Sequence, residues 1–210
     1  MVEPPEPVEP PPPPEPPPPA GDAYPATLSV DYPDRDLDRV SSGFRILTVI
    51  PIAIVLGSIA HVGILFLPPL LMIVFRRKYP RWWYDWNLQL IRFATRVIAY
   101  AFLMYDRYPS TDEEQTVHVD FPYPDAERDV SQFMPLVKWL LVIPHVIVLL
   151  FLYIGVLFTI IFSWFAILFT GRYPRGAFDF VEGVLRWHLR VTAYAFILIT
   201  DQYPPFRLRP

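Results

Sequence analysis

The sequence predicts an all-α membrane protein, a duplicated helical-hairpin unit with about four transmembrane helices and short β-strands flanking each repeat. Three observations predict this class. Hydrophobic residues make up 53% of the chain and charged residues only 19%, whereas soluble domains carry about 25% charged residues. One long stretch has no charge at all, and the chain contains two similar halves. Each observation is developed below in chain order.

The N-terminal stretch is almost entirely proline and glutamate. Residues 1–22 read MVEPPEPVEPPPPPEPPPPAGD, and proline fixes φ and lacks a backbone donor. We expect an extended polyproline II tail that serves as a solvated spacer or as a ligand for a protein that recognises proline. The predicted domains are this tail, a first, diverged membrane repeat (23–109), a linker (110–115) and a second membrane repeat (116–207).

The two repeats share their motifs in the same order, at an offset of about ninety residues. The matched pairs are LSVDYP (28–33) with VHVDFP (117–122), FRILTVIP (44–51) with VKWLLVIP (137–144), RKYPR (77–81) with GRYPR (171–175), and RVIAYAFLMYDRYP (96–109) with RVTAYAFILITDQYP (190–204). Several motifs in one order indicate duplication.

Each repeat is predicted to begin with a short strand and a long apolar helix. ATLSVDYP and QTVHVDFP alternate apolar and polar residues and stop at a proline, which is typical of a strand. Pro51 and Pro144 are expected to break or kink the apolar helices near their starts, leaving residues 44–50 and 136–143 as interfacial segments. Residues 146–169 carry no charge and would form a helix of about 36 Å, enough to cross a bilayer.

The second helix of each repeat, about 82–104 and 176–199, carries a charged stripe. Its residues are Asp85, Arg92 and Arg96 in the first repeat and Asp179, Glu182, Arg186 and Arg190 in the second. Spacings of four and seven residues place these charges on one helix face. We expect ion pairs between Asp85 and Arg92 and between Glu182 and Arg186. Such a helix either crosses the bilayer, giving four spans, or lies in the interface, giving two spans; four spans are favoured.

Basic Tyr-Pro turns separate the two helices of each repeat. The turns contain the candidate topology determinants Arg76, Arg77, Lys78, Arg81, Arg172 and Arg175. Basic residues in short loops favour the cytoplasmic side. The sequence therefore predicts a multi-pass plasma-membrane protein with these loops in the cytoplasm, the lipid bilayer as its partner and anionic headgroups as possible ligands.

The motifs PLVKWLLVIPH, WFAILFTGRYPRGAFDFVEGVLRW and RVTAYAFILITDQYPPF together resemble the DUF4389 family of bacterial membrane proteins. The resemblance covers residues 116–207, and residues 24–109 look like a second, diverged copy. It implies a multi-pass membrane protein, and no catalytic residue is carried over from the family.

Catalytic and metal-binding patterns do not emerge from the sequence. The chain has no cysteine, no glycine-flanked serine and no glycine-rich phosphate loop. The four histidines, His61, His118, His145 and His188, lack the clustered spacing that a metal site requires. We expect no catalytic residue, no cofactor and no metal site, and a net charge of −3 gives no reason to expect nucleic acid as a partner.

Two functions remain open at this point. The first is a non-enzymatic scaffold or accessory subunit that contacts an unknown protein partner through its Pro-rich tail. The alternative is a small transporter or channel whose polar path is lined by the Arg/Asp stripes. Stripes that converge on a hydrated cavity would favour transport, and stripes sealed in ion pairs would favour the scaffold.

Overall fold

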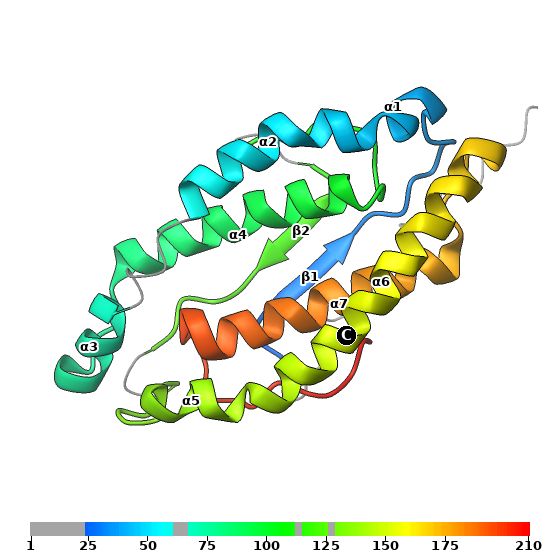
Figure 1. Cartoon of the computed structure of the whole chain (residues 1–210). Helices are drawn as coiled ribbons and strands as arrows, with labels where there is room; N and C mark the ends of the chain where they lie inside the picture. The colour runs from blue at the N-terminus through cyan, green and yellow to red at the C-terminus, as the bar shows by residue number, and fades with distance from the viewer. Residues whose placement is uncertain (1–23, 61–66, 112–114, 126–128) are drawn as a thin grey trace, which may run out of the picture.

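The structure, a computed structural model, describes residues 24–60, 67–111, 115–125 and 129–210; the Pro-rich tail and His61 lie outside them. The elements in chain order (Figure 1) are β1 (Thr27–Val30), α1 (Arg39–Gly43), α2 (Arg45–Ala60), α3 (Leu67–Arg76), α4 (Arg81–Ala101), β2 (Val117–Asp120), α5 (Pro135–Leu141), α6 (Ile143–Thr170), α7 (Arg175–Thr192) and the π-helical turn η2 (Ala193–Ile197).

The two predicted strands are confirmed, and they pair with each other. β1 and β2 form an antiparallel two-stranded ribbon in which Leu28 faces Val119 and Val30 faces Val117. These four apolar side chains are buried. The alternating polar residues Thr27, Ser29, His118 and Asp120 point away from the helices and are exposed. The period-two alternation therefore gives the ribbon one core face and one polar face.

The two halves of the chain exchange their strands. β1, from the N-terminal half, packs on α7 of the C-terminal half, and β2 packs on α4 of the N-terminal half. Each half therefore covers the charged helix of the other. Separating the halves would expose one apolar strand face and one helix face on each side.

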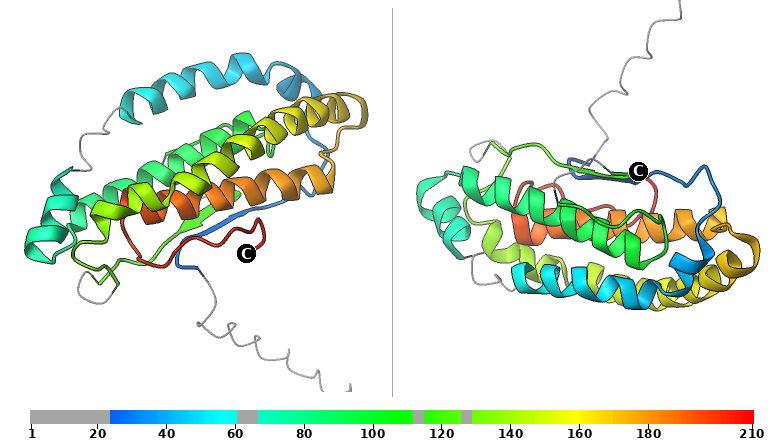
Figure 2. Two further views of the ribbon diagram at one scale, coloured as in Figure 1. Left: turned by 60° about the horizontal axis from the view of Figure 1, so that its bottom comes forward. Right: turned by 90° about the horizontal axis from the view of Figure 1, so that it is seen from above.

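The molecule has three layers, and Figure 2 shows them edge-on. The ribbon forms the first layer, α4 and α7 form the second, and α2 and α6 form the third. Within the two helical layers, α2 packs on α4 and α6 packs on α7. The middle helices are amphipathic, which suits a layer whose two faces meet different neighbours.

The outer helical layer is apolar and largely exposed. In α6 the buried residues form one narrow stripe: His145, Leu149, Val156, Ser163 and Ile167. The exposed large apolar residues of α2 and α6 include Ile46, Leu47, Ile50, Ile54, Leu150, Phe151, Phe158, Phe162 and Phe169. A contiguous apolar surface of this kind marks a site of contact with a membrane or a protein.

The prediction of about four transmembrane helices is wrong for the chain that the structure describes. By length and composition α6 alone could cross a bilayer, and only 17% of its most apolar stretch is buried. The apolar helix α2 ends at Ala60 and is shorter than the roughly 20 residues that a span needs. The second helices α4 and α7 do exist, but their charged faces pack on the ribbon.

The two early prolines behave differently from one another. Pro144 follows a helix break at Val142 that separates α5 from α6, as the sequence predicts. Pro51 lies inside α2, so the helix does not break at this proline, and the interruption falls instead at Phe44, between α1 and α2. The opposite face of α2 packs on α4, and this packing holds the helix together across the missing backbone donor.

Candidate functional site

The stripe of α7 binds the backbone of β1. Arg186 donates through Nε to the carbonyl of Leu28 (2.9 Å) and through Nη2 to Oε1 of Glu182 (2.7 Å). The same carboxylate oxygen accepts the backbone N–H of Val30 (3.1 Å). The expected Glu182–Arg186 pair is therefore present, and it serves to attach a strand edge to a helix.

The C-terminal segment also depends on this stripe. Arg190 donates to the carbonyls of Arg207 (3.2 Å) and Arg209 (3.1 Å), and Arg186 donates to that of Leu208 (3.1 Å). The segment approaches α7 so closely at Gly183 that a Cβ there would lie 2.8 Å from Cβ of Leu208. Asp179 is exposed and stands apart from this cluster.

The stripe of α4 contacts β2 in a parallel manner but with different acids. Arg92 donates to the carbonyl of Val119 (2.9 Å) and pairs with Asp120 (3.2 Å), and Arg96 donates to the carbonyl of Ser110 (3.0 Å). Asp85 pairs with Arg81 at 3.3 Å, so the expected Asp85–Arg92 pair is wrong. Arg92 pairs with Asp120 because β2 packs along α4 and the Arg92 side chain reaches the edge of the ribbon where Asp120 lies.

Two buried ion pairs lie at equivalent places in the two halves. Arg45, 2% exposed, contacts Asp106 at 2.6 Å, and its guanidinium stacks 3.9 Å from the ring centre of Tyr100. Lys138, fully buried, contacts Asp201 at 2.7 Å and lies 4.9 Å from the ring centre of Tyr194. A buried cation is stable only when it is paired and hydrogen-bonded. Arg45 and Lys138 are among the most deeply buried charged side chains of the described chain.

Sequence reasoning missed both pairs, although the similar motifs of the two halves place their residues at matching positions. Arg45 and Lys138 hold the same position in FRILTVIP and VKWLLVIP, and Asp106 and Asp201 both precede a Tyr-Pro stop. A cation and an acid that recur at matched positions of both halves are candidates for contact. The interpretation of Lys138 as an interfacial residue was wrong, because Thr200 and Tyr194 enclose it.

The π-helical turn accommodates a difference in length between the halves. Both helices reach a residue of left-handed conformation, Leu103 after α4 and Leu198 after η2, each with φ of 64°. From Arg190 to Leu198 the chain has one residue more than from Arg96 to Leu103. A π-turn absorbs one extra residue without changing the helix axis. It therefore lets Asp201 reach Lys138 as Asp106 reaches Arg45.

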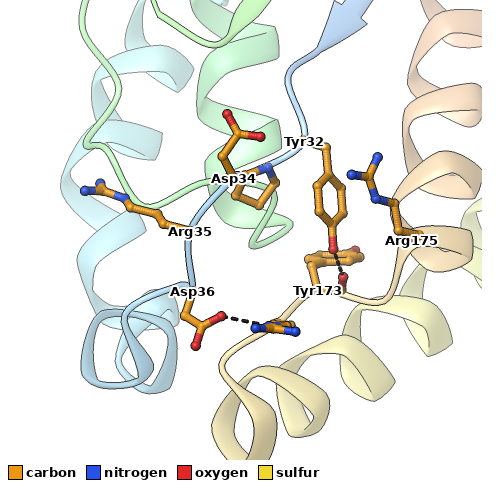
Figure 3. Close-up of a pocket in the computed structure, with 8 residues that line it drawn as sticks. Tyr32, Asp34, Arg35, Asp36, Tyr173 and Arg175 are labelled. Atoms are coloured by element: carbon orange, nitrogen blue, oxygen red, sulfur yellow. Dashed lines mark hydrogen bonds and ion pairs between the residues drawn. The ribbon is translucent and has the colours of Figure 1, made fainter.

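The basic Tyr-Pro turns are each held by a tyrosine that follows a strand. The hydroxyl of Tyr32 donates to the carbonyl of Tyr173, and Arg175 stacks 3.8 Å from the ring centre of Tyr32, as Figure 3 shows. At the other turn, Tyr123 donates to the carbonyl of Tyr79 (2.7 Å) beneath Arg81. Each turn is thus fixed by cation–π and hydrogen-bond contacts.

The cavity beside the turn between α6 and α7 is polar. It measures about 270 Å³ and is lined by Tyr32, Asp34, Asp36, Arg172 and Arg175, among others. Asp36 pairs with Arg172 at 2.9 Å and raises the pKa of that guanidinium through this hydrogen bond and charge. The paired acids largely neutralise the basic residues here.

The six candidate topology determinants are all exposed, but they do not lie on one side. The turn between α3 and α4 and the turn between α6 and α7 lie at opposite ends of the long axis (Figure 1). Helices that cross a bilayer along that axis would place the two turns on opposite faces of the membrane. The multi-pass topology with both turns in the cytoplasm is therefore not supported.

The described histidines occupy separate places. His118 contacts Asp31 on the ribbon (3.1 Å), His145 accepts a hydrogen bond from Trp187 (3.0 Å) and stacks on Phe206, and His188 lies beside Tyr153. Within the described ranges no three His, Cys, Asp or Glu side chains gather as a metal site would require.

The comparisons agree with the resemblance in one half of the chain. The family model described as a domain of unknown function, DUF4389, matches residues 135–207, which cover α5, α6, α7 and η2. The match is a single one, so a second tandem copy in residues 24–109 is not shown. No curated protein and no solved structure matches the chain significantly. The matched segment thus contains Lys138, Asp201 and the stripe of α7, with one helix apolar enough to suggest membrane association.

Proposed function

We propose that the protein is a non-enzymatic scaffold embedded in one leaflet of a membrane, with its helices parallel to the bilayer plane. The apolar layer of α2 and α6 enters the lipid, and the polar ribbon faces water and binds a protein partner. The observation that carries this proposal is the stacking of a polar two-stranded ribbon on the side opposite the apolar layer (Figure 2).

The ribbon explains why α6 would lie along the bilayer. α7 packs along α6, and β1 packs on α7. If α6 crossed the bilayer, α7 and β1 would therefore enter the bilayer with it. The outer face of the ribbon carries the exposed polar side chains of Thr27, Ser29, His118 and Asp120, and hydrocarbon cannot satisfy their hydrogen-bonding groups. An α6 that crossed the bilayer would draw those side chains into hydrocarbon. An in-plane α6 keeps them in water and places both basic turns at the headgroups.

The scaffold role is supported by where the polar groups of the stripes go. Arg92 and Arg186 both donate to strand carbonyls, which favours a structural use of the stripes over a transport path. The outer ribbon face borders a polar cavity of about 450 Å³ near Ser29 and His118. Tyr24, the first described residue after the Pro-rich tail, is buried and donates to the carbonyl of Arg190 on α7. The outer face of the ribbon is the proposed partner surface.

We also infer that the two halves derive from one unit. The matched ion pairs and the matched tyrosine contacts at the turns support this origin, although only one half carries the family match. Strand exchange would then descend from a dimer in which two copies shared a ribbon.

The membrane geometry can be tested directly because the chain has no cysteine. Single cysteines at Val146, Leu157 and Phe169, all exposed on α6, would carry an environment-sensitive dye. Depth-dependent quenching by spin-labelled lipids should place all three at similar depth. A central position far deeper than both ends would contradict the in-plane geometry.

The partner surface needs a separate test in cells. A photo-crosslinking residue at Ser29 or His118 should give protein adducts of defined mass, whereas one at Phe162 should react with lipid alone. Membrane association is checked by vesicle flotation at neutral pH. Failure of both ribbon positions to yield a protein adduct would contradict the scaffold role.

A further inference from the structure

The C-terminal segment (205–209) covers one face of α7. Arg186 and Arg190 donate to backbone carbonyls of this segment over distances of 3.1–3.2 Å. At Gly183 the segment approaches so closely that an added Cβ would lie 2.8 Å from Cβ of Leu208. Three positions of α7 therefore contact the same segment.

The three matching positions of α4 line a cavity instead. They lie 94 residues earlier, at Gln89, Arg92 and Arg96, and they border the polar cavity of about 450 Å³ beside β2. Arg96 keeps one contact of the same kind, to the carbonyl of Ser110 (3.0 Å). The side chain of Arg92 is 32% exposed, whereas that of Arg186 is 10% exposed. Thus α4 has an open site where α7 has a bound segment.

The edge of β2 adds backbone donors to this cavity. On β1 the N–H of Val30 points to the outer edge, where it donates to Glu182. Val117 faces Val30 in the antiparallel register, so its N–H points out of the ribbon as well, and so does that of Val119. The position of α4 that matches Glu182 is Leu88, which has no acceptor for these donors. The open site therefore presents an excess of hydrogen-bond donors.

We propose that this cavity holds the chain's own Pro/Glu-rich segment (1–22), which lies outside the described residues, in the way that the C-terminal segment is held on α7. Prolines supply carbonyl acceptors and carry no N–H of their own, which suits a site with an excess of donors. The segment contains four glutamates and one aspartate but no lysine or arginine. Its negative charge complements Arg92 and Arg96, which line the cavity.

The length of the Pro/Glu-rich segment allows this contact. Thr27, at the start of β1, also lines the cavity, and it follows the end of the segment at Asp22 by five residues. A polyproline II chain covers about 3.1 Å per residue, so the segment can reach along the whole of β2. Covalent connection raises its local concentration to about the millimolar range, so that weak contacts suffice. The bound segment would cover part of the surface that we propose for a protein partner, and the inference does not depend on the membrane placement.

Photo-crosslinking in the purified full-length protein tests the contact. A photo-crosslinking residue replaces Gln89, which is exposed and lines the cavity, and isotope-labelled protein without this residue is added in equal amount. We expect an adduct with residues 1–22 of the same, unlabelled chain, located by peptide mass spectrometry. Its yield should exceed that of the control position by about tenfold, because the segment is tethered beside the cavity.

The control position is Asp179, which is exposed on α7 and does not line the cavity. Thr111, exposed on the cavity wall, provides a second crosslinking position if the Gln89 variant does not fold, as circular dichroism would show. Removing the glutamate charges should lower the adduct yield about threefold, because exposed ion pairs are individually weak. The variant for this purpose combines Glu3→Gln, Glu6→Gln, Glu9→Gln and Glu15→Gln.

The outcomes separate this inference from the proposed function. A yield with residues 1–22 no higher than at Asp179 overturns the inference, and so does an adduct with the labelled chain, which would place the segment of a second copy in the cavity. A partner adduct at Ser29 in cells without this intramolecular adduct leaves the scaffold role intact and overturns the inference. Protein that gives the intramolecular adduct but does not float with vesicles supports the inference and contradicts the membrane placement.

Discussion

Both halves of the molecule bury a cation beside an aromatic ring, but the side chain that carries the charge differs between them. In the C-terminal half Lys138 uses a compact ammonium group that Thr200 and Asp201 satisfy. In the N-terminal half Arg45 uses a planar guanidinium that stacks closely on Tyr100 and keeps two donors unpaired. The difference teaches that the same position accepts either cation as long as an acid and an aromatic ring pair with it, although the planar guanidinium has more donors to satisfy than the ammonium group.

The most disruptive change should be Asp201→Asn. Lys138 is fully buried, and removing the charge of its partner leaves an uncompensated ammonium group. We expect a loss of about 3–5 kcal/mol in the free energy of unfolding, measured by denaturation in detergent. The double variant Lys138→Met with Asp201→Leu removes both charges and should recover most of the loss. A single variant as stable as the wild type would show that the pair is unimportant.

The matching change in the N-terminal half, Asp106→Asn, should cost less. The guanidinium of Arg45 lies 3.9 Å from the ring centre of Tyr100 and keeps this stabilisation, whereas the ammonium group of Lys138 lies farther, at 4.9 Å, from the ring centre of Tyr194. We expect a loss of about 1.5–3 kcal/mol in the same denaturation experiment. A loss larger than that of Asp201→Asn would reverse the comparison between the halves.

The charged stripes offer a second contrast between the halves. Glu182→Gln weakens contacts to Arg186 and to the N–H of Val30, and we expect a loss of about 1–3 kcal/mol in the free energy of unfolding. Asp85→Asn removes an exposed pair with Arg81 and should change it by less than about 0.5 kcal/mol. Swapping the charges of Glu182 and Arg186 together tests their coupling: a double swap no more stable than either single swap would exclude a specific pair.

The two tyrosines that hold the basic turns should behave alike. Tyr32→Phe and Tyr123→Phe each remove one hydrogen bond from a tyrosine hydroxyl to a turn carbonyl. We expect each substitution to lower the free energy of unfolding by about 0.5–1.5 kcal/mol. Thermal unfolding followed by circular dichroism measures both. Unequal losses would indicate that one turn is fixed mainly by the stacked arginine.

The smallest expected effect is a pH dependence of the free energy of unfolding that arises from Lys138 in the C-terminal half. Burial lowers the pKa of Lys138, and Asp201 only partly opposes this. Between the folded pKa and the unfolded value of about 10.4, the unfolded chain binds more protons, so this group makes the free energy of unfolding rise with pH. Comparing wild type with Lys138→Met/Asp201→Leu below pH 10 isolates it. If the difference in free energy of unfolding between the two proteins does not change with pH, the pKa of Lys138 is not lowered.

This comparison must stay below pH 10 because several tyrosines titrate above it. Burial raises the pKa of Tyr24, Tyr79 and Tyr105, whereas unfolded tyrosine ionises near about pH 10. The unfolded chain therefore binds fewer protons above that pH, and stability falls as pH rises. Alkaline extraction would therefore destabilise the protein, and flotation at neutral pH is the better assay for membrane association.

Several features could be predicted from the sequence because they depend on local pattern. The alternation of apolar and polar residues around Leu28 and Val119 predicts a strand. The uncharged run of residues 146–169 predicts a long apolar helix. The spacing of Glu182 and Arg186 places them together on α7 whatever the helix meets. The span count failed because α2 is too short to cross a bilayer and because α4 and α7 pack their charged faces on the ribbon.

The sequence by itself determined the apolar helix, the two strands, the basic turns and the recurrence of their motifs, since each follows from composition or from short-range periodicity. The tertiary structure decided what each face meets. Each strand packs on the charged helix of the other half, and the arginines of the stripes donate to strand carbonyls. Arg45 pairs with Asp106, and Lys138 pairs with Asp201. A helical period shows that one face differs from the other, whereas the partner of that face is set by contacts between residues far apart in the chain.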